Sequence, residues 1–359
     1  MRLISKLGSI FFAFKKTTIP KDVRNILIIR SAAIGDVLMS TPLVSTVRKL
    51  YPRAKISYLV GDWSKQVLAN NPDINEAISF KDGIISKKEI FAVASLIKRI
   101  KRKKFDLAIV LDKSYLWGLF AYFCKIHFRV GFDRCGEGFA NNLNVKFAGR
   151  KYELDYNLDI ASILKANTQD RRMKLNLTKK DIQFANNFIK NNKLKGRTLV
   201  GLAPGGARNP GQELALKRWP KDKYVDLVNE LSKRKNTKII LFGGKWDKEI
   251  NNYVIKNTHN GVIDTAGKIT IQQSAALVGK CKCFVTNDSG SMHIAATTNT
   301  KVIALFGPTA PKRFAPNNAV VITSKKCKPC YDIYGRYKRC KEHECMDGIK
   351  VKDVLRRIR

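Results

Sequence analysis

Short runs of apolar residues alternate with amphipathic segments along the first third of the chain. Such runs are typical of strands that are buried on both faces. The predicted strands are residues 25–30, 55–60, 76–80 and 105–111. The predicted helices are residues 36–50 (or 40–50), 87–103 and 117–125, with Pro42 in the first turn of the first helix. This alternation predicts a parallel sheet with helices on both faces.

The pattern breaks over residues 134–172, where the only expected helix lies near 158–164, and a polar helix is expected at 179–190. A second series then follows. Its predicted strands are residues 198–203, 238–242, 262–264, 283–287 and 302–306, and its predicted helices are 222–233, 271–279 and 293–298. We therefore expect an α/β protein with two Rossmann-like, doubly wound domains that face each other across a cleft.

The expected organisation has three parts. Residues 1–20 form a basic amphipathic segment, residues 21–170 an N-terminal domain, and residues 171–359 a C-terminal domain. The apolar run at residues 7–14 is too short to span a bilayer. It is either a helix in a membrane interface or a packed terminal helix.

Charge is the unusual feature of the composition, with 68 Lys and Arg against 29 Asp and Glu and a net charge of +39. Such an excess attracts nucleic acid, anionic lipid or phosphorylated glycolipid, although a solvated basic surface is an equal alternative. No nucleic-acid-binding motif is present, so no specific nucleic-acid partner is expected.

Three loops that follow predicted strands carry candidate chemistry. Gly35 would permit a tight turn after Ser31. Asp36 follows it and is either a helix cap or a carboxylate that accepts a proton. Gly205 and Gly206 can present N–H groups to an anion, and Lys217 and Arg218 follow them. The third group comprises Asp288, Ser289, Gly290 and His293, with Gly307, Pro308 and Thr309 on the next loop. Spacing alone favours a helix cap for Asp36, and each of the other loops could equally be an ordinary turn or a capped helix start. The loops at residues 203–208, 286–293 and 307–311 converge on one sheet edge, and together they indicate a diphosphate site.

At these residues the chain resembles a known family. The segments that carry the resemblance are residues 29–37, 217–220, 287–293 and 306–309. They are similar to those of the family 9 glycosyltransferases, the bacterial ADP-heptose:lipopolysaccharide heptosyltransferases, in the right order over residues 25–350. The resemblance implies a GT-B fold with an acceptor-binding N-terminal domain and a donor-binding C-terminal domain. It also implies inverting transfer of heptose from ADP-heptose to an anionic glycolipid, the lipopolysaccharide inner core.

The resemblance also implies roles for individual residues. Asp36 is the expected general base, Ser31 and Gly35 lie on the acceptor side, and Lys217 meets the donor diphosphate. No cofactor is required if protein cations stabilise the departing ADP. The basic surface suits a cytoplasmic enzyme bound peripherally to the anionic inner face of the cytoplasmic membrane.

Two departures from the family pattern keep alternatives open. Residues 243–247 replace the family's usual Gly-x-Glu-like segment near the nucleoside, and the loop at 207–216 is longer than expected. The donor is therefore ADP-heptose or another nucleotide sugar. A non-enzymatic basic protein that binds nucleic acid or an anionic surface is the competing class.

Four cysteines cluster near the C-terminus, namely Cys327, Cys330, Cys340 and Cys345. Their spacing is compatible with tetrahedral zinc. Structural zinc, disulfides and unreactive thiols are the three alternatives.

Overall fold

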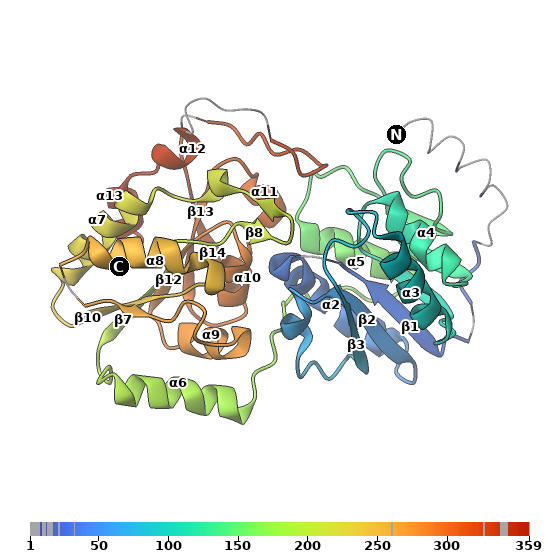
Figure 1. Ribbon diagram of the computed structural model, residues 1–359, viewed down its shortest axis with the longest axis horizontal. Coiled ribbons are helices and arrows are strands. Elements are labelled where there is room, and N and C mark those ends of the chain that lie inside the picture. The colour runs from blue at the N-terminus through green and yellow to red at the C-terminus, as the bar shows by residue number, and fades with distance from the viewer. Residues whose placement is uncertain are drawn as a thin grey trace. The chain divides into compact units, whose positions relative to one another are not determined.

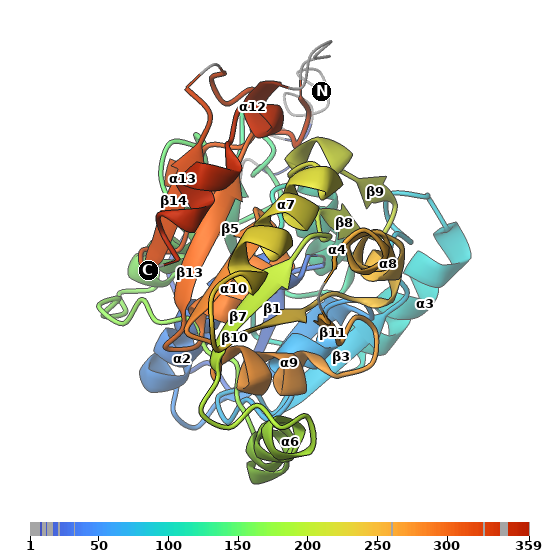
Figure 2. The ribbon, with the colours of Figure 1, turned by 90° about the vertical axis from the view of Figure 1, so that its left-hand side faces the viewer.

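The chain forms two compact units, Met1–Lys174 and Leu175–Arg359. The structure, a computed structural model, describes residues 8, 12, 17–20, 22–31, 33–259, 261–325, 327–337 and 344–358 (Figures 1 and 2). Most of the predicted N-terminal segment, residues 1–20, therefore lies outside the described residues. Phe12 is described, and its ring packs edge-on against Tyr122 with centroids 4.9 Å apart. Within the described part of the chain, no helix has the length and apolarity needed to cross a bilayer.

The first unit is built on a six-stranded parallel sheet of order β3-β2-β1-β4-β5-β6. Its strands are β1 (Asn25–Ile29), β2 (Lys55–Gly61), β3 (Glu76–Phe80), β4 (Leu107–Val110), β5 (Phe128–Asp133) and β6 (Leu143–Lys146). The helices are α2 (Ile34–Leu50), η1 (Lys65–Leu68), α3 (Ile90–Lys101), α4 (Tyr115–Phe123) and α5 (Glu153–Ile163). The strand order reverses between β1 and β4, the point at which ligands of doubly wound sheets bind.

The second unit repeats this strand order in a sheet of order β11-β10-β7-β12-β13-β14, again entirely parallel. Its strands are β7 (Thr198–Ala203), β10 (Thr237–Leu241), β11 (Ile263–Asp264), β12 (Cys283–Asn287), β13 (Lys301–Phe306) and β14 (Ala319–Thr323). The longer helices are α6 (Lys179–Asn191), α7 (Lys221–Ser232), α8 (Lys248–Lys256) and α9 (Ile271–Val278). The shorter ones are η2 (Ala215–Lys217), η3 (Lys245–Asp247), α10 (Gly290–Ala296), α11 (Pro311–Phe314), α12 (Glu344–Asp347) and α13 (Val351–Leu355). The predicted pair of doubly wound α/β units is confirmed.

The loop that was expected to be long forms a small antiparallel hairpin, β8 (Arg208–Asn209) and β9 (Gln212–Glu213). Strands β5, β6 and β14 and helix α8 are additional elements that the hydrophobic pattern did not predict.

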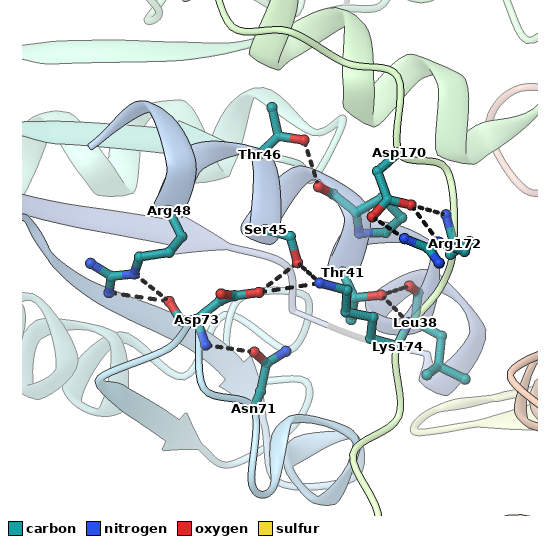
Figure 3. A network of polar contacts seen from close by, with 11 residues as sticks. Leu38, Thr41, Ser45, Thr46, Arg48, Asn71, Asp73, Asp170, Arg172 and Lys174 are labelled. Atoms are coloured by element: carbon teal, nitrogen blue, oxygen red, sulfur yellow. Dashed lines mark hydrogen bonds and ion pairs between the residues drawn. The ribbon is translucent and has the colours of Figure 1, made fainter. Parts of the chain in front are cut away.

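Pro42 does not lie in the first turn of its helix, as predicted, because α2 begins at Ile34 and contains Pro42 in its interior. A proline inside a helix removes the N–H that would bond to the carbonyl four residues earlier. Here that carbonyl belongs to Leu38, and the hydroxyl of Thr41 donates to it at 2.7 Å (Figure 3). The side chain of Thr41 thus supplies the missing donor, and the helix continues.

The segment that leaves the first unit is fixed to the same helix (Figure 3). The backbone N–H of Lys174 donates to Thr41 Oγ1 at 2.8 Å, and Lys174 Nζ donates to Ser45 Oγ at 2.8 Å. Asp73 accepts from Ser45 at 2.5 Å and lies 3.7 Å from Lys174 Nζ. These bonds place residues 171–174 with the first unit, whereas the predicted boundary was at residue 170.

Candidate active site

In the first unit, an ion pair lies directly beyond the end of β1. Arg30 follows the strand, and its Nη2 contacts Asp36 Oδ1, in the first turn of α2, at 2.7 Å. The Arg30 side chain is 11% exposed and that of Asp36 is 27% exposed, so the carboxylate remains accessible. Burial alone would lower the pKa of Arg30, but Asp36, Asp112 and Glu153 outweigh it and raise the pKa, so the guanidinium stays charged.

The loop after β4 completes this cluster. Strand β4 is the neighbour of β1 at the point where the strand order reverses. Asp112 accepts from Ser31 N at 2.7 Å and from Ser31 Oγ at 3.0 Å, which ties the two loops together. Arg30 Nη1 donates to Leu111 O at 2.8 Å. Burial raises the pKa of Asp112, although Arg30 and Ser31 act against it. Ser31, which was predicted to bind the acceptor, thus links the loop after β1 to the loop after β4.

A second buried ion pair extends the cluster. Lys113 Nζ lies 2.6 Å from Glu153 Oε2, with the side chains 14% and 5% exposed, and it also lies 4.5 Å from the centroid of the Phe147 ring. Burial lowers the pKa of Lys113, although Glu153 acts against it. The motif reading missed the roles of Arg30, Asp112, Lys113 and Glu153. The signal that could have found Asp112 and Lys113 is their place directly after the strand next to β1.

Two local expectations about this loop are wrong. Asp36 is not a helix cap: the N-cap position belongs to Ala33 and has no side-chain cap. Gly35 does not provide the tight turn, because it lies inside α2 and the positive φ belongs to Ala33, at 65°. Such a φ is strained for alanine, and strain of this kind is concentrated at functional sites.

In the second unit, Asn287 at the end of β12 links two loops through its fully buried side chain. Its Nδ2 donates to Pro204 O at 2.9 Å and to Gly205 O at 3.0 Å. Its Oδ1 accepts from Trp219 N at 3.0 Å and from Tyr224 Oη at 3.2 Å. The loop after β7 and the start of α7 are thereby held against β12.

The carboxylate of Asp288, the next residue, accepts hydrogen bonds from two of the predicted site residues. Lys217 Nζ donates to Asp288 Oδ2 at 2.8 Å, and Thr309 Oγ1 donates to the same oxygen at 2.6 Å. Burial alone would raise the pKa of Asp288, but Lys217, Thr309 and His293 outweigh it and hold the pKa below its usual value. The side chain of Lys217 is 13% exposed. Lys217 is thus a fixed cation at the reversal of strand order.

The glycines of the second unit leave room for buried polar groups. A Cβ on Gly205 would lie 2.2 Å from Asp247 Oδ1, and Gly206, with φ of 80°, would bring one to 2.6 Å from Ser289 Cβ. Asp247 accepts from Gly206 N and Gly244 N, both at 2.8 Å. It joins the loops after β7 and β10, a role that the motifs did not reveal. Ser289 Oγ is buried with no hydrogen-bond partner, so it does not cap α10 as expected.

The remaining predicted donor residues lie close to these groups. Arg218 Nε donates to Gly206 O at 3.0 Å, and its Nη1 pairs with Glu213 at 2.8 Å. His293 is buried in α10, which begins at Gly290 rather than at the predicted residue 293. Pro308 O accepts from the backbone N–H groups of residues 330 and 331. A Cβ on Gly307 would meet Met346 and Cys345, so that face of Gly307 packs against the C-terminal segment.

The predicted zinc ligands are only partly described, because Cys340 lies outside the described residues. Cys345 is buried in the core of the second unit, and Cys327 packs against the same cluster. Among the residues with described positions, no group of three or more His, Cys, Asp or Glu side chains could hold a metal ion. The zinc site depends on Cys340 and stays a prediction.

Sequence comparison shows which known proteins this chain resembles. Residues 93–341 match the model of "Glycosyltransferase family 9 (heptosyltransferase)". The chain is 31% identical to the lipooligosaccharide heptosyltransferase 2 of Haemophilus influenzae over 306 residues, which is 81% of this chain and 86% of that protein.

Solved structures show the same fold. A family 9 glycosyltransferase from Veillonella parvula aligns with a TM-score of 0.78 at 21% identity, over 95% of this chain and 97% of that one. The Escherichia coli ADP-heptose lps heptosyltransferase II aligns with a TM-score of 0.72 at 24% identity, over 93% and 97%. The match to a family of enzymes removes the non-enzymatic binding protein as an alternative. The chain therefore belongs to glycosyltransferase family 9, the family of the lipopolysaccharide heptosyltransferases.

Proposed function

We propose that this enzyme transfers heptose from ADP-heptose to the lipopolysaccharide inner core with inversion at the anomeric carbon. Two of the relatives named above support this choice: the Haemophilus influenzae protein is named as a lipooligosaccharide heptosyltransferase, and the Escherichia coli protein as an ADP-heptose lps heptosyltransferase. The observation that carries the mechanism is the Asp36 carboxylate. It is partly exposed, is oriented by Arg30 and lies at the strand end where ligands of such sheets bind.

In this mechanism Asp36 accepts the proton of the attacking acceptor hydroxyl. The hydroxyl oxygen forms a bond to C1 of the heptose while the bond from C1 to the β-phosphate oxygen breaks. Attack occurs opposite to the leaving group, so the configuration at C1 inverts. Arg30 keeps Asp36 in place, and Asp112 keeps the Arg30 loop in place.

ADP departs with an additional negative charge, which the second unit is suited to stabilise. Lys217 is a fixed cation, and the glycine loop at residues 205–206 allows close backbone approach to a diphosphate. The unpartnered hydroxyl of Ser289 gains a hydrogen-bond partner when a phosphate oxygen lies beside it. Positioned donors of this kind stabilise a leaving group without a metal ion.

Other donor classes are tested alongside ADP-heptose, because the Asp247 carboxylate already accepts hydrogen bonds from Gly206 N and Gly244 N. Residues 243–247 also depart in sequence from the Gly-x-Glu-like segment expected near the nucleoside. Nucleotide release is followed with ADP-heptose, UDP-sugars and GDP-sugars on a Kdo-lipid acceptor. The proposal expects release from ADP-heptose alone; release from a UDP- or GDP-sugar in its place would contradict it.

Asp36→Asn tests the mechanism. We expect kcat to fall by about 10²–10⁴-fold, because the general base is lost, while ADP binds as in the wild type. Asp22→Asn is the control, since Asp22 is exposed and pairs only with nearby Arg24 among its described ion pairs. Unchanged turnover of Asp36→Asn would exclude Asp36 as the base.

We also place the enzyme peripherally at the anionic inner face of the cytoplasmic membrane, where the acceptor and the lipid are both anionic. The net charge of +39 supports this location, since anionic lipids attract basic surfaces.

A further inference from the structure

Exposed apolar side chains of the first unit are concentrated on two neighbouring helices. Half of the large hydrophobic residues that are exposed in the described part of the chain belong to α3 and α4: Ile90, Phe91, Leu116, Tyr122 and Phe123. Phe91 is 92% exposed, Ile90 74% and Phe123 57%. Exposed apolar side chains that cluster on one face commonly mark an interaction site, so this face is a candidate interaction surface.

The two helices lie side by side on one face of the first sheet (Figure 1). Their inner residues, such as Leu96, Ile100 and Phe120, are buried in one hydrophobic cluster with the strands. The exposed residues therefore belong to the outward side of these helices, where Tyr122 also contacts Phe12. They are an addition to the fold and not part of its core.

The same face is basic. Along α3, Phe91 is followed at positions i+7 and i+11 by exposed Lys98 and Arg102, which lie on the same side of the helix. Neither α3 nor α4 contains an acidic residue. Glu89, which precedes α3, is ion-paired with Lys81 at 3.2 Å. Exposed Lys125 directly follows α4 and its cap residue.

We propose that the outer face of α3 and α4 is the surface by which this enzyme docks on an anionic lipid bilayer. Phe91, Ile90 and Phe123 enter the interfacial region, while Lys98, Arg102 and Lys125 contact the lipid phosphates. A protein partner would need acidic groups to match these basic residues, whereas an anionic bilayer supplies negative charge at high density. This inference deepens the proposed function, since it assigns the membrane contact to particular residues.

Vesicle co-sedimentation of the full-length protein tests the proposal, without donor or acceptor. Vesicles of phosphatidylglycerol with phosphatidylcholine are compared with vesicles of phosphatidylcholine alone. We expect wild-type protein to bind the anionic vesicles selectively. Phe91→Ser with Phe123→Ser, and separately Lys98→Glu with Arg102→Glu, should each weaken partitioning by at least about tenfold.

Matched controls are available on α6, in the other unit. Ile182→Ser removes an apolar side chain that is 47% exposed, and Lys180→Glu with Lys190→Glu makes the same change in net charge as the α3 pair. These controls should bind vesicles like the wild type. Circular dichroism verifies that every variant is folded.

Three results would overturn the proposal: wild-type protein that ignores anionic vesicles, α3 and α4 variants that bind normally, or equal losses in the α6 charge control. If the aromatic variants instead abolish a dimer seen by size-exclusion chromatography, the face is an interface between two copies. Failure here is distinct from failure of the proposed transfer reaction, because transfer to a detergent-dispersed acceptor does not require docking.

Discussion

Asn287 shows how one side chain can fix the geometry of a ligand site. Its amide uses both N–H donors and two acceptor positions, and all four partners belong to the loop after β7 or the start of α7. An amide can make no more bonds than this without unusual crowding. The residue therefore acts as a positioning group for the glycine loop and Trp219, next to the cation Lys217.

Asn287→Ala should lower the free energy of unfolding by about 2–4 kcal/mol, because it leaves buried backbone groups unsatisfied. Urea unfolding followed by circular dichroism measures the change. Asn318→Ala is the control, since Asn318 is exposed and donates to Ala296 O at 3.3 Å, and it should change stability by less than about 0.5 kcal/mol. Equal losses in the two variants would show that Asn287 is not a structural link.

Asp288 predicts a pH dependence of stability. Its folded-state pKa lies below its usual value of 3.8, so it contributes stability that is fully present above that value. The contribution is lost as the pH falls from the usual value through the lower folded-state pKa. Wild-type stability should therefore decline more steeply than that of Asp288→Asn below about pH 4. Parallel unfolding curves over that pH range would contradict the assignment.

At the level of the element, α2 depends on a side chain to tolerate its internal proline. Thr41→Val keeps the shape of residue 41 but removes the hydroxyl that donates to Leu38 O and accepts from Lys174 N. We expect a loss of about 1–3 kcal/mol in unfolding free energy, because two backbone groups lose their partners. Thr41→Ser keeps the hydroxyl and should be closer to the wild type. If valine and serine have the same effect, packing and not hydrogen bonding explains the role of Thr41.

Most strands that the hydrophobic pattern predicted are buried mainly through apolar residues. Strands β1, β4, β7 and β13 are mainly apolar runs, and β1, β4 and β7 lie at the centre of their sheets, whereas the central strand β12 ends in the buried polar residues Thr286 and Asn287. Strand β5 was missed because it contains Arg129, which is buried by bonds to Ala140 O and Ile126 O. Strand β6 is short and alternates between half-buried and exposed residues at a sheet edge. The hydrophobic pattern does not show that backbone carbonyls satisfy a buried guanidinium, or that β6 pairs with β5.

The candidate site residues also divide into those that sequence motifs mark and those that they do not. Asp36, Lys217 and Asp288 could be found because motifs in loops after strands mark them. Asp247 could not, because its role depends on the backbone N–H groups of Gly206 and Gly244, which donate to its carboxylate. Glu153 was missed for the same reason: it is a helix residue whose importance comes from Lys113, forty residues away in sequence.

At the scale of the whole molecule, each unit has the components of an independent domain. The two main hydrophobic clusters of the second unit draw all their buried members from residues 185–358, and its sheet contains strands from that unit only. Its candidate donor residues, including Lys217, Asp288 and Thr309, also bond to one another within it. Donor recognition should therefore be separable from acceptor recognition.

Residues 175–359 expressed alone should fold and bind ADP with an affinity similar to that of the full chain, because a domain with its own core can fold alone. Cooperative thermal unfolding tests the first part and calorimetric titration with ADP tests the second. Lys217→Ala in the same fragment should weaken ADP binding, since it removes the cation proposed to meet the diphosphate and leaves Asp288 without its main partner. Residues 1–174, as a matched fragment, should not bind ADP. A folded second unit that fails to bind ADP would mean that the nucleotide site needs groups from the first unit, and the assignment of the donor site to the second unit alone would then be wrong.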